Sequence, residues 1–181
     1  HTTASDGMYA SDELVRMAKE RGLTAVAITD HDTVSGIQSA NMAGQKYNVE
    51  VVPGIEVSTV YQGKEIHVLG YFVDFTSKAF LNDLIHLREG RHRRNQMLIK
   101  RLNELGIAIT LDEVAAKQTD PNGNVGRPHF AQVLVDKKVV NTIQEAFDFY
   151  LGEGGKAYVS TPRISPEEGV QLIVRHGGIP V

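Results

Sequence analysis

Histidine and carboxylate side chains stand beside or within apolar stretches at several places in this sequence. His1 and Asp6 lie in HTTASDG, His31 lies in TDHD, Glu56 in PGIEVS and His67 in EIHVLGY. Singly, each has an ordinary explanation, since a strand histidine is usually a satisfied core residue and Asp before Gly usually belongs to a turn. Glu56 and His67, however, interrupt apolar strands, where an unpaired polar group costs free energy. A shared metal cluster satisfies all of these groups, and such ligands suit Zn, Mn, Fe or Mg.

The tetrapeptide TDHD, residues 29–32, follows the apolar run TAVAI at 24–28, which predicts a buried strand. In α/β proteins, functional groups gather just past the carboxyl ends of such strands. A histidine between two aspartates is typical of a metal ligand with carboxylates that orient it. It is equally typical of a loop that caps a helix, so the tetrapeptide alone favours neither interpretation.

The composition excludes several classes of protein. The chain has 181 residues, enough for one domain with an insert, and a net charge of −3, which excludes a strongly basic nucleic-acid binder. Without cysteine there are no disulfides, thiolate metal sites or cysteine nucleophiles. No stretch approaches the roughly 18 apolar residues of a membrane span, and no signal-peptide pattern is present. We expect a cytoplasmic protein with no membrane association and no obligate protein partner.

The alternation of strand and helix patterns indicates an α/β fold. Residues 1–75 predict, in order, a helix at 11–21, a strand at 24–29, a helix at 35–47 and strands at 50–58 and 64–74. This order favours βαβ units and a mostly parallel sheet. Residues 156–181 return to the same pattern, with a strand at 156–160 and a capped helix from Ser165. Because the chain starts without Met and ends in a strand-like GIPV, we expect a segment of a longer protein.

The middle of the chain has a different pattern. From residue 76 onward, apolar residues follow helical spacing and no convincing strand appears until 156. We expect a helix at 78–105 that Gly90 can divide, a short helix capped by Thr110 and Glu113, a loop at 121–124, and helices at 128–137 and 142–151. Residues 76–155 therefore predict an inserted α-helical subdomain.

As a set, the segments HTTASDG, TDHD, GIEVS and HVLGY resemble the successive motifs of the PHP (polymerase and histidinol phosphatase) domain. The segment GRPHFAQVL at 126–134 resembles the branch of phosphoesterases that act on 3′,5′-nucleotide bisphosphates and as 5′→3′ exoribonucleases. The resemblance covers nearly the whole chain. It implies a distorted (β/α)₇ barrel, truncated at both ends here, with two or three divalent metal ions and a helical insert that helps to cover the site.

The resemblance also implies a role for each candidate ligand. His1 matches the second histidine of the family's HxH pair, and Asp6 and His31 match ligands of one metal. Glu56 matches the carboxylate that bridges two metals, and His67 matches a ligand of another metal. The family's remaining ligands, a first histidine, a late histidine and an Asp–His pair, would lie outside this sequence.

These features predict a metal-dependent phosphoesterase that hydrolyses nucleotide bisphosphates or the 5′ ends of short RNA, with His31 and Glu56 as catalytic residues. A metal-activated hydroxide would attack the phosphorus without a covalent enzyme intermediate, because bound cations make water a nucleophile near neutral pH and clamp the phosphoryl oxygens. Two alternatives remain open. One is a phosphatase of small metabolites such as histidinol phosphate, and the other is a degenerate PHP module that binds without catalysis.

Two further sets of residues are candidates for binding the substrate's phosphate. Arg127 and His129 lie at a predicted helix start beside Pro128, where the helix dipole and a guanidinium can hold a phosphate together. An ordinary surface arginine beside a proline is an equal alternative. The second set is a run of basic residues within the long predicted helix: Arg88, Arg91, Arg93, Arg94, Lys100 and Arg101. This run could be solvated helix surface, or it could bind an RNA backbone in a salt-dependent way.

Overall fold

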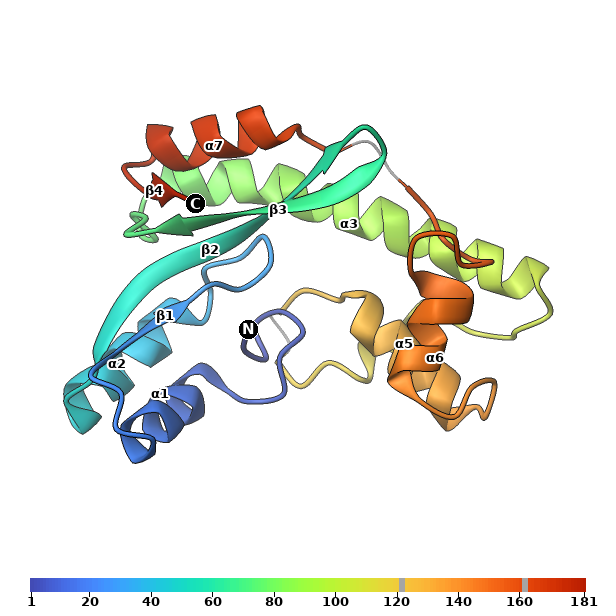
Figure 1. Cartoon of the computed structure of the whole chain (residues 1–181), viewed down its shortest axis with the longest axis horizontal. Coiled ribbons are helices and arrows are strands. Elements are labelled where there is room, and N and C mark those ends of the chain that lie inside the picture. Colours follow the sequence, from blue (N-terminus) through green and yellow to red (C-terminus); the bar gives the residue numbers. More distant parts are fainter. Residues whose placement is uncertain (121–122, 161–162) are drawn as a thin grey trace. The chain divides into compact units, whose positions relative to one another are not determined.

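A computed structural model describes residues 1–120, 123–160 and 163–181 (Figure 1). The loop expected at 121–124 therefore lies partly outside the described residues. The elements, in chain order, are α1 (Ser11–Glu20), β1 (Ala25–Ile28), α2 (Ile37–Tyr47), β2 (Glu50–Tyr61), β3 (Lys64–Tyr71), α3 (Lys78–Glu104), α4 (Leu111–Ala115), α5 (Arg127–Asp136), α6 (Ile143–Ala146), the π-helical turn η1 (Phe147–Leu151), α7 (Pro166–Arg175) and β4 (Ile179–Pro180).

The chain divides into two compact units. The strand-bearing unit consists of His1–Arg88, Asp120–Asn124 and Arg163–Val181, and the helical unit consists of Glu89–Thr119 and Val125–Pro162. The first unit holds all of the strands named above with α1, α2, α7 and the start of α3. The assignment of residues 76–155 as an insert in a barrel stays a prediction.

The sheet is mixed, with strand order β1-β2-β3-β4. Strands β1 and β2 are parallel, whereas β2 and β3, and β3 and β4, are antiparallel. The expected α/β class is correct, but the expectation of a mostly parallel sheet is wrong. The reason is the two-residue connection of β2 to β3, in which Gln62 and Gly63 have φ of 50° and 80°. Positive φ at both central residues is the type I′ hairpin turn, whose usual signal is Asn-Gly or Asp-Gly rather than Gln-Gly.

Two other expected elements differ from the structure. Residues 156–160 form no strand, because the Lys156 and Ala157 amides donate to the carbonyls of Phe149 and Tyr150, each at 2.9 Å, and turn back onto η1. Gly90 does not divide α3, which runs unbroken over 27 residues. A single glycine costs a helix about 1 kcal/mol, which the packing of the flanking turns can offset.

The core of the strand-bearing unit lies between its helices and the sheet. Helices α1 and α2 lie together along β1 and the start of β2, while α7 packs on β2 and β3 (Figure 1). The cluster includes Ile37, Ile55, Phe80 and Ile173, all fully buried. Each such side chain contributes roughly 1.5–3 kcal/mol through burial. This core holds the strands that carry the candidate site.

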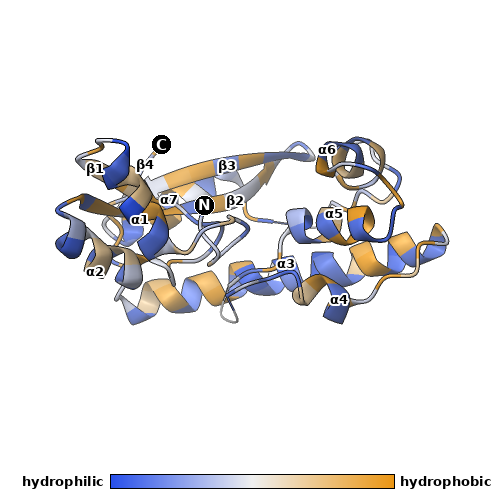
Figure 2. Ribbon diagram, turned by 90° about the horizontal axis from the view of Figure 1, so that it is seen from below, coloured by the Kyte–Doolittle hydropathy of each residue, from blue (hydrophilic) through white to orange (hydrophobic). Residues whose placement is uncertain are grey.

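The helical unit has a separate core, in which Leu98 and Leu102 of α3 pack with Phe130 and Leu134 of α5. Figure 2 shows a polar stretch in the middle of α3 between more apolar turns. Neither this 27-residue helix nor any other described helix is apolar enough to span a membrane.

The basic run on α3 is not one solvated face. Arg91 and Arg94 are buried, with 7% and 2% of their surface exposed. The guanidinium of Arg94 donates to Oδ1 of Asn95 at 2.9 Å, and Asn95 in turn donates to the carbonyl of Val125 at 3.1 Å. The interpretation of all six cations as solvated surface is therefore wrong for these two, because both side chains are buried.

Candidate metal centre

Glu56 lies at the middle of the candidate site because of its position in the sheet. After β1 ends, the chain continues alongside β2, where His31 and Glu56 form an isolated parallel bridge. On the other side, β2 pairs with β3 so that Ser58 is opposite His67. His67 is thus the diagonal neighbour of Glu56 on the same face, within reach of a long side chain. Glu56 and His67 lie inside β2 and β3, as expected for polar residues that interrupt apolar strands.

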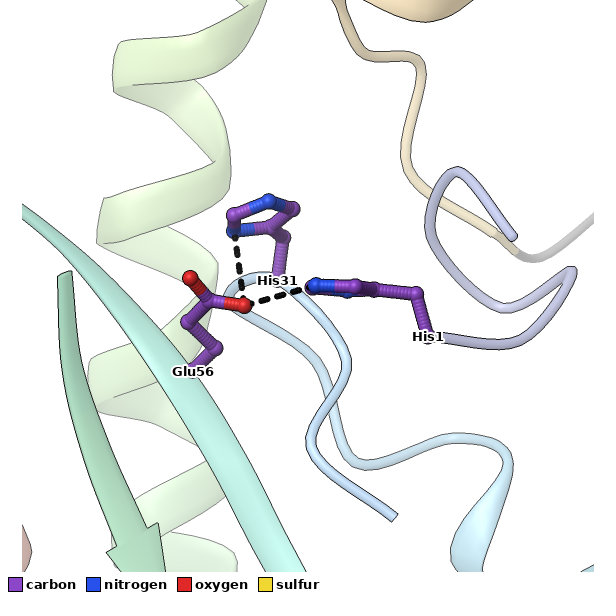
Figure 3. Close-up of side chains that lie close together, drawn as sticks. All are labelled: His1, His31 and Glu56. Carbon is purple, nitrogen blue, oxygen red and sulfur yellow. Dashed lines mark ion pairs between the residues drawn. The ribbon is translucent and has the colours of Figure 1, made fainter.

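The side chains of the five predicted ligands converge on this point. Nε2 of His1 lies 2.8 Å from Oε2 of Glu56, and Nδ1 of His67 lies 2.5 Å from Oε1. His31 places Nδ1 3.8 Å from Oε2 of Glu56 and Nε2 3.8 Å from Oδ2 of Asp6. Figure 3 shows one carboxylate oxygen of Glu56 facing the rings of both His1 and His31. The rings of His1 and His31 stack at 4.5 Å between centroids, and His31 meets His67 edge-on at 4.8 Å.

The charges in this cluster stabilise each other. The hydrogen bond with Glu56 raises the pKa of His1, although burial acts in the opposite direction. Burial would raise the pKa of Glu56, but hydrogen bonds from His1 and His67 outweigh it and hold the pKa well below its usual range. The Glu56 carboxylate therefore stays ionised and available as a ligand.

The donor set fits divalent cations. Among the described residues, His1, His31 and Glu56 each offer a ligand atom, and these atoms lie within 4.8 Å of one another. Two atoms that each lie about 2.1 Å from one ion are roughly 3–4.2 Å apart. The separation of 3.8 Å between Nδ1 of His31 and Oε2 of Glu56 falls in that range, and the 2.8 Å between Nε2 of His1 and the same oxygen lies just below it. Imidazole and carboxylate together suit Zn, Mn or Fe better than Ca.

Two further residues support this centre: Asn124, which sequence reasoning missed, and Asp32, one of the two aspartates that flank His31. The side-chain amide of Asn124 donates to the His31 carbonyl at 2.8 Å, and its backbone amide donates to the Ala4 carbonyl at 2.9 Å. Asp32 has a positive φ of 52° and accepts a hydrogen bond from the Ser58 amide at 2.8 Å. No local signal marks Asn124, because its partners lie far away in the sequence.

The two predicted phosphate-binding residues lie in the helical unit, at the start of α5. Arg127 is the first residue of this helix, and its Nη1 lies 3.4 Å from the carbonyl of Leu151. His129 accepts a hydrogen bond from the Gly126 amide through Nδ1 at 3.0 Å and so caps the helix. The five predicted metal ligands, by contrast, all belong to the strand-bearing unit.

Comparison with known proteins identifies the family. The model of the PHP domain matches residues 1–158, and this chain belongs to that family. The 5′-3′ exoribonuclease Rnm of Escherichia coli is 33% identical over 98% of this chain and 61% of its own length. A 3′,5′-nucleoside bisphosphate phosphatase of Chromobacterium violaceum is 33% identical over 100% of this chain and 63% of its own length.

Solved structures share the fold. A protein from Bifidobacterium adolescentis, classed as a metal-dependent phosphoesterase, has a TM-score of 0.92 and 31% identity over 99% of this chain and 63% of its own. An amidohydrolase from Chromobacterium violaceum, solved with bound sulfate and no metal, has a TM-score of 0.91 and 32% identity with the same coverage. The chain thus spans less than two thirds of the length of these relatives.

Proposed function

We propose that this chain forms the metal-binding part of a phosphoesterase that hydrolyses 3′,5′-nucleotide bisphosphates or the 5′ ends of short RNA. The observation that carries the proposal is the position of the Glu56 carboxylate. One oxygen faces His1 and His31, and the other faces His67. A carboxylate whose two oxygens face separate nitrogen donors suits a ligand that bridges two cations.

The proposed ligands divide into two sets around this carboxylate. Asp6 and His31 would hold one ion with Glu56, His67 would hold a second ion with the other oxygen of Glu56, and His1 would be a further ligand of the centre. A third ion would need ligands outside this sequence. We propose Mn, Zn, Fe or Mg as the metal, because nitrogen and carboxylate donors suit these ions.

Divalent cations, when bound, make water a stronger nucleophile and neutralise charge on the phosphoryl oxygens. The residues of this chain supply the geometry for that chemistry. Glu56 stays ionised under its two hydrogen bonds, and His31 lies between Asp6 and Glu56, so both are proposed as catalytic residues. Arg127 and His129 are proposed to bind the substrate's phosphate, since a guanidinium at a helix start is a strong anion site.

The names of the relatives support nucleotide or RNA as the substrate, because they include an exoribonuclease and a nucleoside bisphosphate phosphatase. Sulfate bound in a related structure supports an anion site in the same fold. We further propose that the mixed sheet of this chain is part of the distorted (β/α)₇ barrel expected from the sequence, with the helical unit as its insert.

The proposal is tested by metal analysis and by phosphate release in the full-length protein. The substrates are adenosine 3′,5′-bisphosphate, a short 5′-phosphorylated RNA and histidinol phosphate. Metal-dependent release from the first two supports the proposal. Phosphate release only from histidinol phosphate would instead identify a phosphatase of small metabolites. If the protein neither binds metal nor releases phosphate, the degenerate binding module is the better interpretation.

The variant Glu56→Gln removes the charge of the bridging carboxylate but keeps its shape. We expect turnover to fall to background while the circular dichroism spectrum stays that of the wild type. Glu50→Gln is the matched control, because Glu50 is an exposed residue at the start of the same strand. Turnover retained in Glu56→Gln would exclude Glu56 from catalysis.

A further inference from the structure

Asp30 is a buried carboxylate beside the candidate metal centre, with 1% of its surface exposed. Both of its oxygens accept hydrogen bonds from the N-terminal loop. The Thr2 amide donates to Oδ1 at 2.6 Å, and the Thr2 hydroxyl donates to Oδ2 at 2.7 Å. The Ser5 hydroxyl also donates to Oδ1, at 2.6 Å. A buried carboxylate satisfied in this way is held by strong, charge-assisted hydrogen bonds.

The loop that Asp30 holds is the one that carries His1 and Asp6. It folds tightly on itself, because the amides of Ser5 and Gly7 both donate to the Thr2 carbonyl, at 3.0 and 2.9 Å. A Cβ at Gly7 would lie 2.3 Å from the carbonyl oxygen of His1, so the backbone leaves no room for another residue there. Fixing Thr2 and Ser5 therefore fixes the backbone positions of both ligands.

Asp30 also contacts the strand that carries Glu56. The Asp30 carbonyl accepts a hydrogen bond from the Glu56 amide at 3.0 Å. Its side chain thus holds the loop of His1 and Asp6, while its backbone is paired with the strand that carries Glu56. In addition, the Ser5 hydroxyl lies 3.5 Å from Nδ1 of His1, which places a polar atom beside the ring nitrogen that does not face Glu56.

We propose that Asp30 is a positioning residue, which sets the affinity of the centre for metal by holding His1 and Asp6 against Glu56. This inference rests on the metal centre of the proposed function. Asp30 would hold the two ligands in place through its hydrogen bonds with Thr2 and Ser5. Removing such a support for a metal ligand typically lowers metal affinity about 10–100-fold.

The test is isothermal titration calorimetry of the full-length protein with Mn²⁺ and, separately, with Zn²⁺. We expect Asp30→Asn to bind either ion about 10–100-fold more weakly than the wild type, with an unchanged circular dichroism spectrum. Asp74→Asn is the matched control, because Asp74 is an exposed aspartate that accepts two hydrogen bonds from Thr76, at 2.7 and 3.1 Å. We expect it to bind both ions as the wild type does.

If Asp30→Asn does not fold, two variants of Thr2 test the same contact from its other side. Thr2→Val removes the hydroxyl that donates to Asp30 at nearly constant volume, and Thr2→Ser keeps it. We expect weaker metal binding in Thr2→Val and wild-type binding in Thr2→Ser. In the double variant, the effects of Asp30→Asn and Thr2→Val should not add, because both break the same contact.

The outcomes separate the two proposals. Wild-type protein that binds neither ion overturns the metal centre itself, and the role of Asp30 with it. Wild-type protein that binds metal, together with Asp30→Asn of equal affinity, overturns the positioning role alone. Equal metal affinities of Thr2→Val and Thr2→Ser would likewise overturn the positioning role alone.

Discussion

Gly54 is a position where one added methyl group should disturb the candidate site through the spacing of its strands. This residue lies in β2, two positions before Glu56, with β1 on one side and β3 on the other. A Cβ at this position would lie 2.8 Å from Cγ2 of Thr29, 2.9 Å from the Gly70 carbonyl oxygen and 3.0 Å from the Ile28 carbonyl oxygen. Two of these three atoms are backbone, so the strands themselves must move in Gly54→Ala.

The size of the effect follows from these distances. Relief of the contacts requires shifts of about half an ångström, which is the tolerance of a functional site. Overpacking of this kind costs roughly 1–3 kcal/mol. For a protein of this length that lowers the melting temperature by roughly 2–12 °C. Because the displaced segments lead to His31 and His67, we expect affinity for Mn²⁺ to fall at least about tenfold as well.

The assay combines thermal unfolding with calorimetric Mn²⁺ titration of the full-length protein. Gly63→Ala is the control, since Gly63 lies in the hairpin turn of the same two strands. Its φ is +80°, and nothing lies within 4 Å of an added Cβ. The control should lose about 1–2 kcal/mol of stability through backbone strain and keep its Mn²⁺ affinity. Wild-type Mn²⁺ affinity in Gly54→Ala would refute the reasoning that strand spacing sets the site.

Two further changes probe the substrate and the scaffold. Arg127→Ala should raise KM by about 10–100-fold with little change in kcat, because an arginine–phosphate hydrogen bond is worth roughly 1.5–3 kcal/mol; steady-state kinetics with an unchanged KM would reject the phosphate role. Ser165→Ala should cost about 1 kcal/mol in urea unfolding and leave Mn²⁺ affinity intact, since the Ser165 hydroxyl accepts from the Glu168 amide at 3.2 Å and caps α7. Ser165→Thr keeps the cap, and equal stability of the Ala and Thr variants would show that it contributes nothing.

Local rules predicted the helices well because their signals are local. The capping boxes of Thr110 with Glu113 and of Ser165 with Glu168 are both confirmed, and each begins the helix that was expected. The hairpin turn escaped prediction because Gln62 adopts a conformation that Asn or Asp adopts more readily. Here tertiary context, the pairing of two long strands, outweighs the preference of the turn residue.

The candidate site was predictable only in part. The types of the five residues, and the apolar strands that two of them interrupt, pointed to one cluster, and the structure brings their side chains together. The sequence pointed to Asp30 and Asp32 as groups that could orient a ligand, but the contacts that hold the ligands were not predictable. Asp30 reaches Thr2 across 28 residues, and Asn124 reaches His31 across 93, so neither contact has a local pattern.

The five proposed ligands are held by two different kinds of structure. Glu56, His31 and His67 are fixed by the register of the sheet, in which His31 bridges Glu56 on one side and His67 lies diagonally on the other. His1 and Asp6 lie on a loop that depends on side-chain hydrogen bonds to Asp30. The register of the sheet determines which side chains meet at the centre, whereas a loop held by a few side-chain contacts moves more easily by fractions of an ångström than paired strands do. We therefore expect substitutions in the loop contacts to change metal affinity with less loss of stability than Gly54→Ala, which has to move the strands themselves.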